Sequence, residues 1–337
     1  MDEKIILGIE SSCDETSASV VINGRRILSN VIASQIDIHK RFGGVVPEIA
    51  SRNHTMAIIP VIDEALTAAG VRPEALDAVG VTCGAGLIGA LLVGVSTAKA
   101  LSFALNKPLV AVSHTRAHVA GNYLAHPDLE PPFICLVVSG GHTSIVRVDG
   151  YTEQTVIGAT TDDACGEAFD KVARILGLDY PGGPAIDKLA ATGAANIDFF
   201  KNAKPSGGGD YNFSYSGLKT AVINYVHNAE QAGRKINPAD LAASFSEYAV
   251  APLVAKTFRA AREYGLNTVA MCGGVSANTL LRRRMTERAE RERVRFLYPP
   301  TVLCTDNAAI VASLAYYQLQ AGIGLADLTL NAQATLA

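Results

Sequence analysis

The sequence has few aromatic residues and no large excess of charge of either sign. Aromatic residues make up 6% of the 337 positions, against thirty glycines. We therefore expect many tight turns and close backbone approaches in place of a bulky aromatic core. The formal net charge is −3, with 18% charged residues. No global positive field attracts nucleic acid, so any contact with RNA must come from a local patch or from a partner.

Paired cysteine motifs and membrane segments are also missing. The six cysteines are widely spread, with no CxxC or CxxH, and a chain of this size needs no disulfides, so we expect reduced thiols. The acidic start, MDEKIILGIE, has too short an apolar run for a signal peptide. The most apolar stretch, residues 84–95, predicts a buried, glycine-rich core helix and not a membrane span. Together these features predict a soluble, cytoplasmic protein without membrane contact.

A dinucleotide-binding GxGxxG between a strand and a helix is absent as well. A different pattern is present twice: IILGIESSCDETSASVVING from Ile5, and ICLVVSGGHTSIVRVDG from Ile134. Each copy predicts an apolar strand, a turn of small and hydroxyl residues, and a second strand. Helical patterns follow the copies at 50–70 and 163–177. The repeat predicts an α/β fold of two similar lobes with a cleft between them.

The turns of both hairpins are rich in serine, threonine and glycine. Such turns offer backbone N–H groups and hydroxyls to a phosphate, although small residues also simply make tight hairpins. A third motif, VAMCGGVSAN at 269–278, predicts a strand, a Gly-Gly turn and a helix. Its glycines let a ring or ribose approach the backbone, and Asn278 either reads a base or sugar edge or lies in the first helical turn. The three motifs together favour a bound nucleotide.

Two of the seven histidines lie four residues apart in SHTRAHVAG, residues 113–121. On a helix His114 and His118 share one face, which suits two metal ligands but also ordinary surface or capping histidines. A third ligand would decide between these interpretations. Asp306, in LCTDNAAIVASLAYYQ, follows a predicted strand and precedes a predicted helix, where the ordinary role of an aspartate is to cap the helix. The residues alone leave the metal site open.

Two further segments have a biased composition. Residues 281–295 contain seven arginines and three glutamates, mostly at spacings that allow ion pairs along a helix. A solvated helix is the simpler interpretation of this segment. In residues 201–217, glycines and serines break all periodicity and predict a long loop. Neither segment assigns a function by itself.

Ten short blocks, in order from residue 8 to residue 309, together resemble the TsaD family of tRNA N6-adenosine threonylcarbamoyltransferases. The blocks are GIESSCDETS (8–17), GGVVPEIASRNH (43–54), GLIGALLVG (86–94), HTRAH (114–118), LVVSGGHT (136–143), GEAFDKVARILGL (166–178), YPGGP (180–184), FSYSGLKT (213–220), GGVSAN (273–278) and CTDNAA (304–309). Each block alone is weakly specific, but ten in the family's order are highly specific. One departure is Ala85, where the family usually has a proline; it lowers the rigidity of the turn and changes no chemical role.

The resemblance implies the actin/Hsp70/sugar-kinase (ASKHA) fold with two ribonuclease-H-like lobes. We expect an N-terminal lobe at 1–128 and a C-terminal lobe at 129–337, with the last helix, from about 307, packed back on the first lobe. The implied reaction moves the threonylcarbamoyl group from threonylcarbamoyl-AMP to N6 of adenosine 37 in tRNAs that read codons beginning with adenine. The implied partners are a TsaB-like paralogue and a TsaE-like ATPase, and segment 84–105 is expected to form part of a contact surface.

The resemblance also implies a ligand set. His114, His118 and Asp306 match the family's metal ligands, with Fe2+ as the implied metal and Zn2+ as an alternative in vitro. The residues implied around the nucleotide are Val137, Val138, Ser139, Gly140 and Gly141 at the phosphate, Asp170, Gly183 and Asp187 near the ribose, and Asn278 near the adenine.

Some of the implied roles have ordinary alternatives. Asp14 and Glu15 are candidates for orienting the amine or accepting its proton, but they also suit a solvent-exposed charged turn. Asp170 is four residues before Arg174 and is therefore placed for an ion pair along a helix. Asp187 lies beside Lys188 and has no cation four residues on, so a structural role explains it less well.

Three other classes of protein fit only part of the pattern. A sugar or carboxylate kinase of the same fold would use the hairpins for ATP phosphates, but it needs a catalytic aspartate with Mg2+ and has no use for a His-x3-His pair. A non-catalytic scaffold, like the family's smaller paralogue, could lose the metal residues, whereas this chain keeps all three. A zincin needs H-E-x-x-H, and the residues between the histidines here are Thr115, Arg116 and Ala117.

Overall fold

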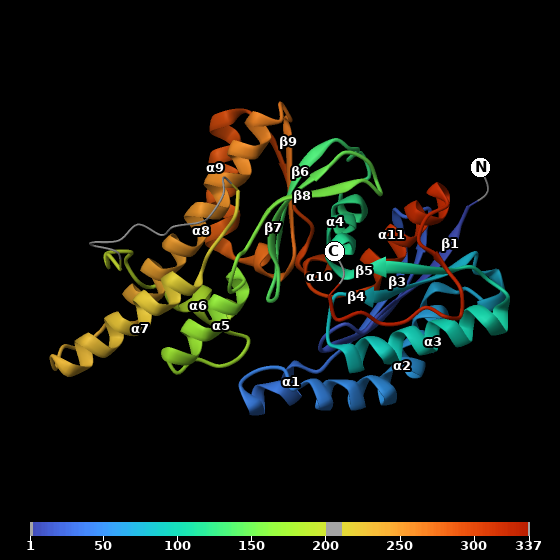
Figure 1. Cartoon of the computed structure of the whole chain (residues 1–337), viewed down its shortest axis with the longest axis horizontal. Coiled ribbons are helices and arrows are strands. Elements are labelled where there is room, and N and C mark those ends of the chain that lie inside the picture. The colour runs from blue at the N-terminus through green and yellow to red at the C-terminus, as the bar shows by residue number, and fades with distance from the viewer. Residues whose placement is uncertain (1–2, 200–210, 336–337) are drawn as a thin grey trace. The chain divides into compact units, whose positions relative to one another are not determined.

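The structure is a computed structural model that describes residues 3–199 and 211–335. The chain divides into two compact units (Figure 1). Unit 1 comprises Met1–Pro131, Gly150–Gln154 and Pro299–Ala337, and unit 2 comprises Pro132–Asp149 and Thr155–Tyr298. Unit 1 is therefore assembled from three separate segments of the chain. Residues 201–210 of the loop predicted at 201–217 lie outside the described residues.

Unit 1 contains a six-stranded sheet with the order β11-β5-β4-β1-β2-β3. Its strands are β1 (Ile5–Glu10), β2 (Glu15–Ile22), β3 (Arg26–Ser34), β4 (Ala78–Gly84), β5 (Leu109–Ser113) and β11 (Leu325–Ala326). Strand β1 pairs antiparallel with β2 and parallel with β4, and β4 is parallel to β5. Every residue of β4 is buried, as expected for a central strand that is covered on both faces.

The helical segments of unit 1 are α1 (Ile36–His39), η1 (Lys40–Phe42), α2 (Pro47–Ala69), η2 (Pro73–Ala75), α3 (Ile88–Leu105), α4 (His114–Ala125), α10 (Thr301–Cys304) and α11 (Ala308–Ala321). Strand β1 shows how they cover the sheet. Leu7 and Ile9 belong to a hydrophobic core shared with α2 and α3. Between them Gly8 faces α11, where a Cβ atom would lie 2.2 Å from the carbonyl oxygen of Ala308. The missing side chain at Gly8 therefore lets α11 lie directly on β1.

The apolar segment 84–95 is not the buried core helix that its composition predicts. It ends β4 and begins α3, and only 28% of the eighteen residues of α3 are buried. The side chains of Ile88, Leu92 and Phe103 are 48%, 42% and 73% exposed. Composition alone does not distinguish a helix that fills a core from one that presents an apolar face. Within the described residues, α3 alone is long and apolar enough to cross a membrane, and one such helix is weak evidence for a span.

Unit 2 contains a five-stranded sheet with the order β10-β9-β6-β7-β8. Its strands are β6 (Phe133–Val138), β7 (Thr143–Val148), β8 (Gln154–Ala159), β9 (Thr268–Cys272) and β10 (Arg295–Leu297). Its helical segments are α5 (Cys165–Ile175), α6 (Gly182–Ala190), α7 (Ser216–Gln231), α8 (Pro238–Glu263), η3 (Gly274–Ala277) and α9 (Thr279–Glu292). A hydrophobic core joins β6 and β9 to α5 and α8.

The two sheets repeat one topology, which confirms the duplicated hairpin predicted from the sequence. In unit 2, β6 pairs antiparallel with β7 and parallel with β9, and β9 is parallel to β10. Strands β10-β9-β6-β7-β8 thus correspond in order to β5-β4-β1-β2-β3 of unit 1. The α/β class and the internal repeat are both as expected.

Candidate metal centre and nucleotide-binding residues

Three side chains of unit 1 meet at one point, although one of them comes from almost two hundred residues later in the chain. Nε2 of His114 lies 3.2 Å from Nε2 of His118, and Oδ1 of Asp306 lies 3.5 Å and 3.4 Å from these two atoms. The two histidines are buried, and the carboxylate of Asp306 is 20% exposed. The structure therefore brings together the three residues that the sequence singled out as a ligand set.

Local structure explains these positions. Helix α4 begins at His114, directly after β5, and the four-residue spacing places His118 on the same face. Asp306 lies between α10 and α11, so a short helix precedes it and not the expected strand. Asn307 is the residue that caps α11, because its side chain accepts hydrogen bonds from the backbone N–H groups of Ala309 and Ile310. Capping, the ordinary alternative for Asp306, is therefore performed by its neighbour.

The donor set fits a divalent transition metal. Metal–nitrogen and metal–oxygen bonds of about 2.1 Å place the ligand atoms of one ion roughly 3–3.5 Å apart, which is the range found here. Two imidazole nitrogens with lone pairs facing each other also need a cation or a proton between them. Two histidines and one carboxylate leave coordination positions open for a substrate. The residues present thus suit a catalytic metal better than a closed structural one.

Glu10, which was not predicted from the sequence, contacts His114 at Nδ1, the ring nitrogen that faces away from His118 and Asp306. Its carboxylate is fully buried at the end of β1, and Oε2 lies 3.2 Å from Nδ1 of His114. The same carboxylate accepts hydrogen bonds from the Ser12 backbone N–H and the Thr82 hydroxyl. A carboxylate that accepts the Nδ1 proton leaves the Nε2 lone pair free for a metal and fixes the ring. The sequence signal was a glutamate that ends an otherwise apolar strand, because such a carboxylate needs a partner.

The charges around His114 hold a proton in the metal-free site. Burial alone would lower the pKa of His114, but the nearby carboxylates of Asp306 and Glu10 outweigh it and raise the pKa to about 9. The pKa of Glu10 is lowered: burial opposes this shift, and the positive charge of His114 produces it. The negative charges of Asp306 and Glu10 therefore favour a positive charge at His114. In the metal-free protein this charge is a proton, and a bound metal ion would take its place.

Asp14 and Glu15 do not form the solvent-exposed turn that was their ordinary alternative. Asp14 is buried, and Glu15 is the half-buried first residue of β2, where its carboxylate accepts a hydrogen bond from the Ser34 hydroxyl. Burial and the negative charges of Asp14 and Asp306 raise the pKa of Glu15 to about 9. In the metal-free site Glu15 is consequently protonated at neutral pH and donates a hydrogen bond more readily than it accepts a proton.

The buried imidazole of His54 holds the turn that carries these carboxylates. Its Nε2 lies 3.0 Å from the Cys13 carbonyl oxygen, and its Nδ1 lies 2.7 Å from the Thr16 hydroxyl. A carbonyl only accepts hydrogen bonds, so Nε2 carries the proton and Nδ1 accepts from Thr16. Burial lowers the pKa of His54 and so favours this neutral form. The turn between β1 and β2 is thereby fixed from α2.

In unit 2, the predicted phosphate-binding turn connects β6 to β7. The Ser139 N–H donates to the His142 carbonyl at 2.8 Å, which closes the turn. Two backbone N–H groups in the first turn of α5, those of Gly166 and Glu167, donate to the carbonyl oxygens of Ser139 and Gly140. A Cβ atom added at Gly140 or Gly141 would meet nothing within 4 Å. The glycines therefore keep open the space beside an anchored turn, as a bound group would need. Val137 and Val138 are the buried last residues of β6.

The Gly-Gly turn after β9 lies against this hairpin. Gly273 has a φ of +89°, and a Cβ atom there would lie 2.4 Å from the Val138 carbonyl oxygen. Asn278 caps α9 by accepting from the Leu281 N–H at 2.9 Å, and its Nδ2 donates to Asp187 at 3.1 Å. Of the two roles predicted for Asn278, the geometry shows the one at the start of the helix directly. Its side-chain amide also brings it together with Asp187.

Asp187 and Asp170 both have structural partners. The carboxylate of Asp187 accepts hydrogen bonds from the backbone N–H and the hydroxyl of Thr279. Asp187 therefore has a structural role, contacting the start of α9, which its neighbours in the sequence did not suggest. Asp170 accepts from the Gly182 N–H at 2.7 Å and so ties the start of α6 to α5. Gly183 follows with open space around its Cα. These contacts connect the nucleotide-binding candidates through α5, α6 and the start of α9.

The fold and the site together define a protein of the ASKHA class with a candidate metal centre of two histidines and one aspartate. Among solved structures, HypF of T. kodakarensis matches with a TM-score of 0.66 and 15% identity, over 97% of this chain and 49% of that one. At this level of identity the likeness shows the fold alone.

Sequence comparison places the chain within this class. The model of the family described as TsaD, tRNA N6-adenosine threonylcarbamoyltransferase, matches residues 26–313. A tRNA N6-adenosine threonylcarbamoyltransferase of Clostridium perfringens is 51% identical over 337 residues, which are 100% of this chain and 98% of that protein. One of Symbiobacterium thermophilum is 52% identical over 332 residues, covering 98% and 96% of the two chains. The chain belongs to the TsaD family.

Proposed function

We propose that this chain transfers the threonylcarbamoyl group from threonylcarbamoyl-AMP to N6 of an adenosine in tRNA. The observation that carries the proposal is family membership over the full length, in a chain that keeps the three clustered side chains His114, His118 and Asp306. A kinase of the same fold is not favoured, because the relatives are acyltransferases and the cluster has no part in phosphoryl transfer. A scaffold would have no reason to retain the cluster.

The reaction is an acyl transfer from a mixed anhydride to a poor nucleophile. The lone pair of the exocyclic amine of adenine is delocalised into the ring, so the enzyme must position the amine, polarise the carbonyl and stabilise the departing AMP. When bound, the metal supplies Lewis-acid polarisation of the carbonyl group. Positioning of the amine and stabilisation of the departing AMP belong to the residues of this protein.

In unit 1, three side chains around the ligand set have distinct functions in the proposal. Glu10 holds the Nδ1 proton of His114, so that Nε2 presents its lone pair. Glu15 orients the amine. Asp14, its buried neighbour, accepts the proton that the amine loses when the new bond forms. This assignment is supported by the burial of Asp14 and by the position of Glu15 next to it at the start of β2.

In unit 2, the turn from Ser139 to Gly141, which follows Val137 and Val138 of β6, holds the adenylate phosphate through the backbone N–H groups of Gly140 and Gly141, while the Ser139 N–H closes the turn. Asp170, Gly183 and Asp187 lie near the ribose, and Asn278 near the adenine. The support is the open space at Gly140 and Gly141 and the contact of Gly273 with the end of β6. Stabilisation of the leaving AMP is the contribution of this group of residues.

Fe2+ is the metal that we propose for the site in the cell, with Zn2+ as an occupant in vitro. Imidazole nitrogens accept either ion, so the donor set supports a transition metal without choosing one. Metal analysis of protein purified without oxygen tests the assignment. Iron near one equivalent per chain is expected; zinc alone, under conditions that preserve Fe2+, would contradict it.

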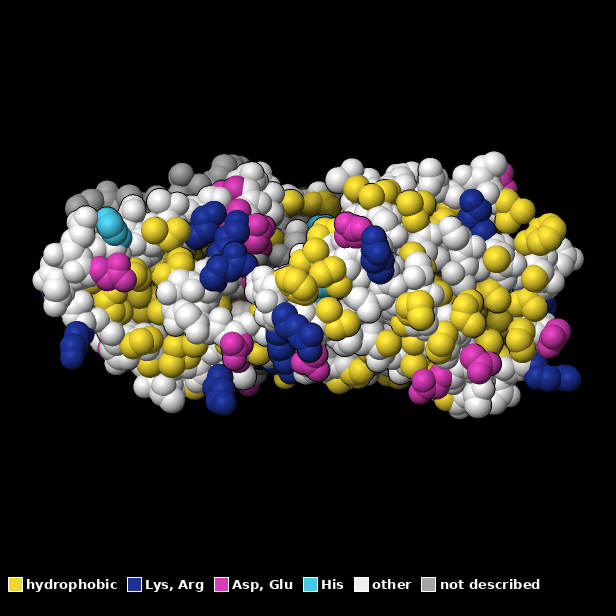
Figure 2. Space-filling model, turned by 90° about the horizontal axis from the view of Figure 1, so that it is seen from below, with side chains coloured by type: hydrophobic (Ala, Val, Ile, Leu, Met, Phe, Trp, Pro, Cys, Tyr) yellow, Lys and Arg dark blue, Asp and Glu magenta, His cyan; other side chains and the backbone are white. Residues whose placement is uncertain are grey.

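The proposed partners are a TsaB-like paralogue and a TsaE-like ATPase, and the apolar face of α2 and α3 is the proposed surface for the paralogue. Hydrophobic side chains gather on the face of unit 1 where these helices lie (Figure 2). Met56 and Ile59 of α2 are 79% and 61% exposed, and Ile88 and Leu92 of α3, a helix in contact with α2, are exposed as well. A surface of this kind indicates a protein partner. We expect the assembly in the cytoplasm, where tRNA is modified.

A transfer assay tests the proposed function. Purified chain, the two partners, threonylcarbamoyl-AMP and an unmodified tRNA transcript are combined, and the nucleosides are analysed by mass spectrometry. Threonylcarbamoyladenosine should form only when the chain is present. Phosphorylation of a small molecule with no transfer to tRNA would favour the kinase instead.

A further inference from the structure

Residues 281–295 form a local excess of positive charge in a chain that is otherwise acidic. Seven arginines and three glutamates give this segment a net charge of +4, whereas the whole chain carries −3, which leaves −7 for the rest. The segment contains no lysine. RNA is a polyanion, so the net negative charge of the rest of the chain opposes its binding. A concentrated cationic segment is therefore the part of this chain suited to attract RNA.

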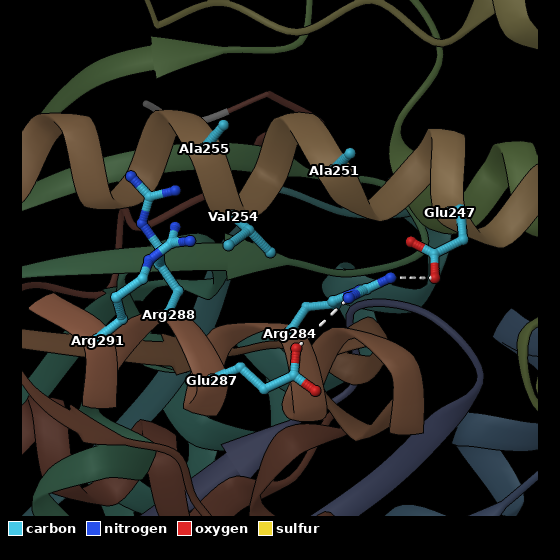
Figure 3. Close-up of a pocket in the computed structure, with 8 residues that line it drawn as sticks. All are labelled: Glu247, Ala251, Val254, Ala255, Arg284, Glu287, Arg288 and Arg291. Atoms are coloured by element: carbon cyan, nitrogen blue, oxygen red, sulfur yellow. Dashed lines mark hydrogen bonds and ion pairs between the residues drawn. The ribbon is translucent and has the colours of Figure 1, made fainter.

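The arginines of α9 line a groove against α8. Leu281, Met285 and Ala289 are buried at four-residue spacing and pack α9 onto α8. This packing turns another set of residues toward a cavity of about 370 Å³ between the helices (Figure 3). The cavity is lined by Arg284, Arg288, Arg291, Glu247, Glu287, Ala251, Val254 and Ala255. Exposed Ala251 and Ala255 are the residues of α8 opposite the arginines, and their short side chains leave the guanidinium groups accessible.

The two ends of the groove differ in charge. Arg284 lies 2.6 Å from Glu247 and 3.4 Å from Glu287, so its charge is neutralised. Arg288 and Arg291 lie side by side at the other end, with their guanidinium groups directed toward α8 (Figure 3). Arg288 pairs with Glu292, whereas exposed Arg291 has no ion pair among the residues that the structure describes. This end of the groove keeps a net positive charge.

Helix stability does not explain the arrangement. The ion pairs Arg283–Glu287 and Arg288–Glu292 both have the arginine first, and the reverse order supports a helix better. The first turn of α9 has no acidic residue, although the positive end of the helix dipole favours acids there. A helix selected only as a solvated, ion-paired surface would have the opposite order.

We propose that the Arg288–Arg291 end of this groove binds the phosphate backbone of tRNA. This inference rests on the proposed function, in which tRNA is the substrate. It adds the location on this chain where the tRNA backbone is bound. Guanidinium groups bind phosphate oxygens through two parallel hydrogen bonds, which lysine does not offer. Glu292 compensates only one of the two adjacent guanidinium charges, so a bound anion is favoured beside them. An acidic protein segment would satisfy the same charge, so the test must separate it from RNA.

The test compares two double variants of the full chain with the same change in charge. Arg288→Gln with Arg291→Gln alters the groove, and Arg72→Gln with Arg234→Gln alters exposed arginines elsewhere. Binding of an unmodified tRNA transcript is measured by fluorescence anisotropy over a series of salt concentrations. The groove variant should bind about tenfold or more weakly at low salt, with a logarithmic salt slope smaller by roughly one to two. AMP affinity and melting temperature should match those of the control.

Equal tRNA affinity and salt slope in the two double variants would overturn the inference, even if the wild-type chain modifies tRNA. Loss of binding to a partner protein with tRNA affinity retained would also overturn it and assign the groove to protein. A wild-type chain that binds tRNA through the groove but fails to modify it with both partners present would instead contradict the proposed function.

Discussion

Asp306 and Asn307, which are adjacent in the sequence, have different roles: Asp306 lies with the two histidines, and Asn307 caps α11. The sequence allowed Asp306 to be either a metal ligand or a helix cap, and the next residue takes the cap. A second result is Glu10, whose role needed the structure because Thr82 and His114, its hydroxyl and imidazole partners, come from β4 and α4. Sequence spacing predicts contacts within one helix; it does not predict contacts between separate strands and helices.

Glu10→Gln should weaken metal binding by roughly 10- to 100-fold, because the neutral amide no longer fixes the Nδ1 proton of His114 as a carboxylate does. Competition with a chelator measures the dissociation constant. Asp77→Asn is a matched control, since this carboxylate accepts from the backbone N–H of Ile5 at the other end of β1. Equal metal affinity in Glu10→Gln and the control would show that Glu10 only fills space.

Gly140→Val should abolish AMP binding and leave the fold intact. The added side chain meets no protein atom near its Cβ, so the protein tolerates it, but it occupies the space proposed for the phosphate. Isothermal titration measures the affinity, and circular dichroism checks the fold. Unchanged affinity for AMP in the folded variant would remove the Ser139–Gly141 turn from the nucleotide site.

Glu15→Gln should stabilise the metal-free protein more at pH 8 than at pH 5. The pKa of Glu15 is about 9 in the folded protein against 4.5 as its ordinary value, so the folded state binds the extra proton between these pH values. The free energy of unfolding therefore falls as pH rises through this window, and glutamine removes that loss. Melting temperatures at the two pH values, with chelator present, measure the effect. A difference between variant and wild type that is independent of pH would contradict the raised pKa.

At the scale of elements, the sequence predicted the hairpins and helices well and their surfaces poorly. The repeated strand–turn–strand pattern became β1–β2 and β6–β7, because period-two alternation and small turn residues are local signals. Burial of α3 was predicted wrongly, since apolar composition is equally suited to a core and to a surface that meets a partner. The position of Asp306 beside α4 was accessible only through the resemblance to a family.

Gly8→Ala should destabilise the protein by about 1–3 kcal/mol, because the added methyl group forces α11 away from β1. A Cβ atom there would lie 2.2 Å from the Ala308 carbonyl oxygen. Metal affinity should fall as well, since Asp306 lies two residues before Ala308. Gly217→Ala, in α7 with open space around its Cα, is the control and should not destabilise. Chemical denaturation measures both variants; equal stability would contradict the close packing of α11.

At the scale of the whole molecule, the order of ten blocks carried more information than any single motif. The family and the fold class follow from that order, and comparison with relatives about half identical confirms them. The lobe boundaries predicted at 1–128 and 129–337 stay a prediction; the compact unit 1 of the structure also includes Gly150–Gln154 and Pro299–Ala337. Local periodicity does not show where a chain returns to an earlier unit.

The proposed role of the whole molecule is to modify tRNA through the His114–His118–Asp306 cluster. The most direct test is mass spectrometry of tRNA nucleosides from cells depleted of the chain and then supplied with wild type or with the His114→Ala, His118→Ala double variant. Threonylcarbamoyladenosine should disappear on depletion and return with wild type but not with the variant, while the variant still folds and binds AMP. Undiminished threonylcarbamoyladenosine after depletion would contradict the function, and full restoration by the double variant would contradict the metal centre.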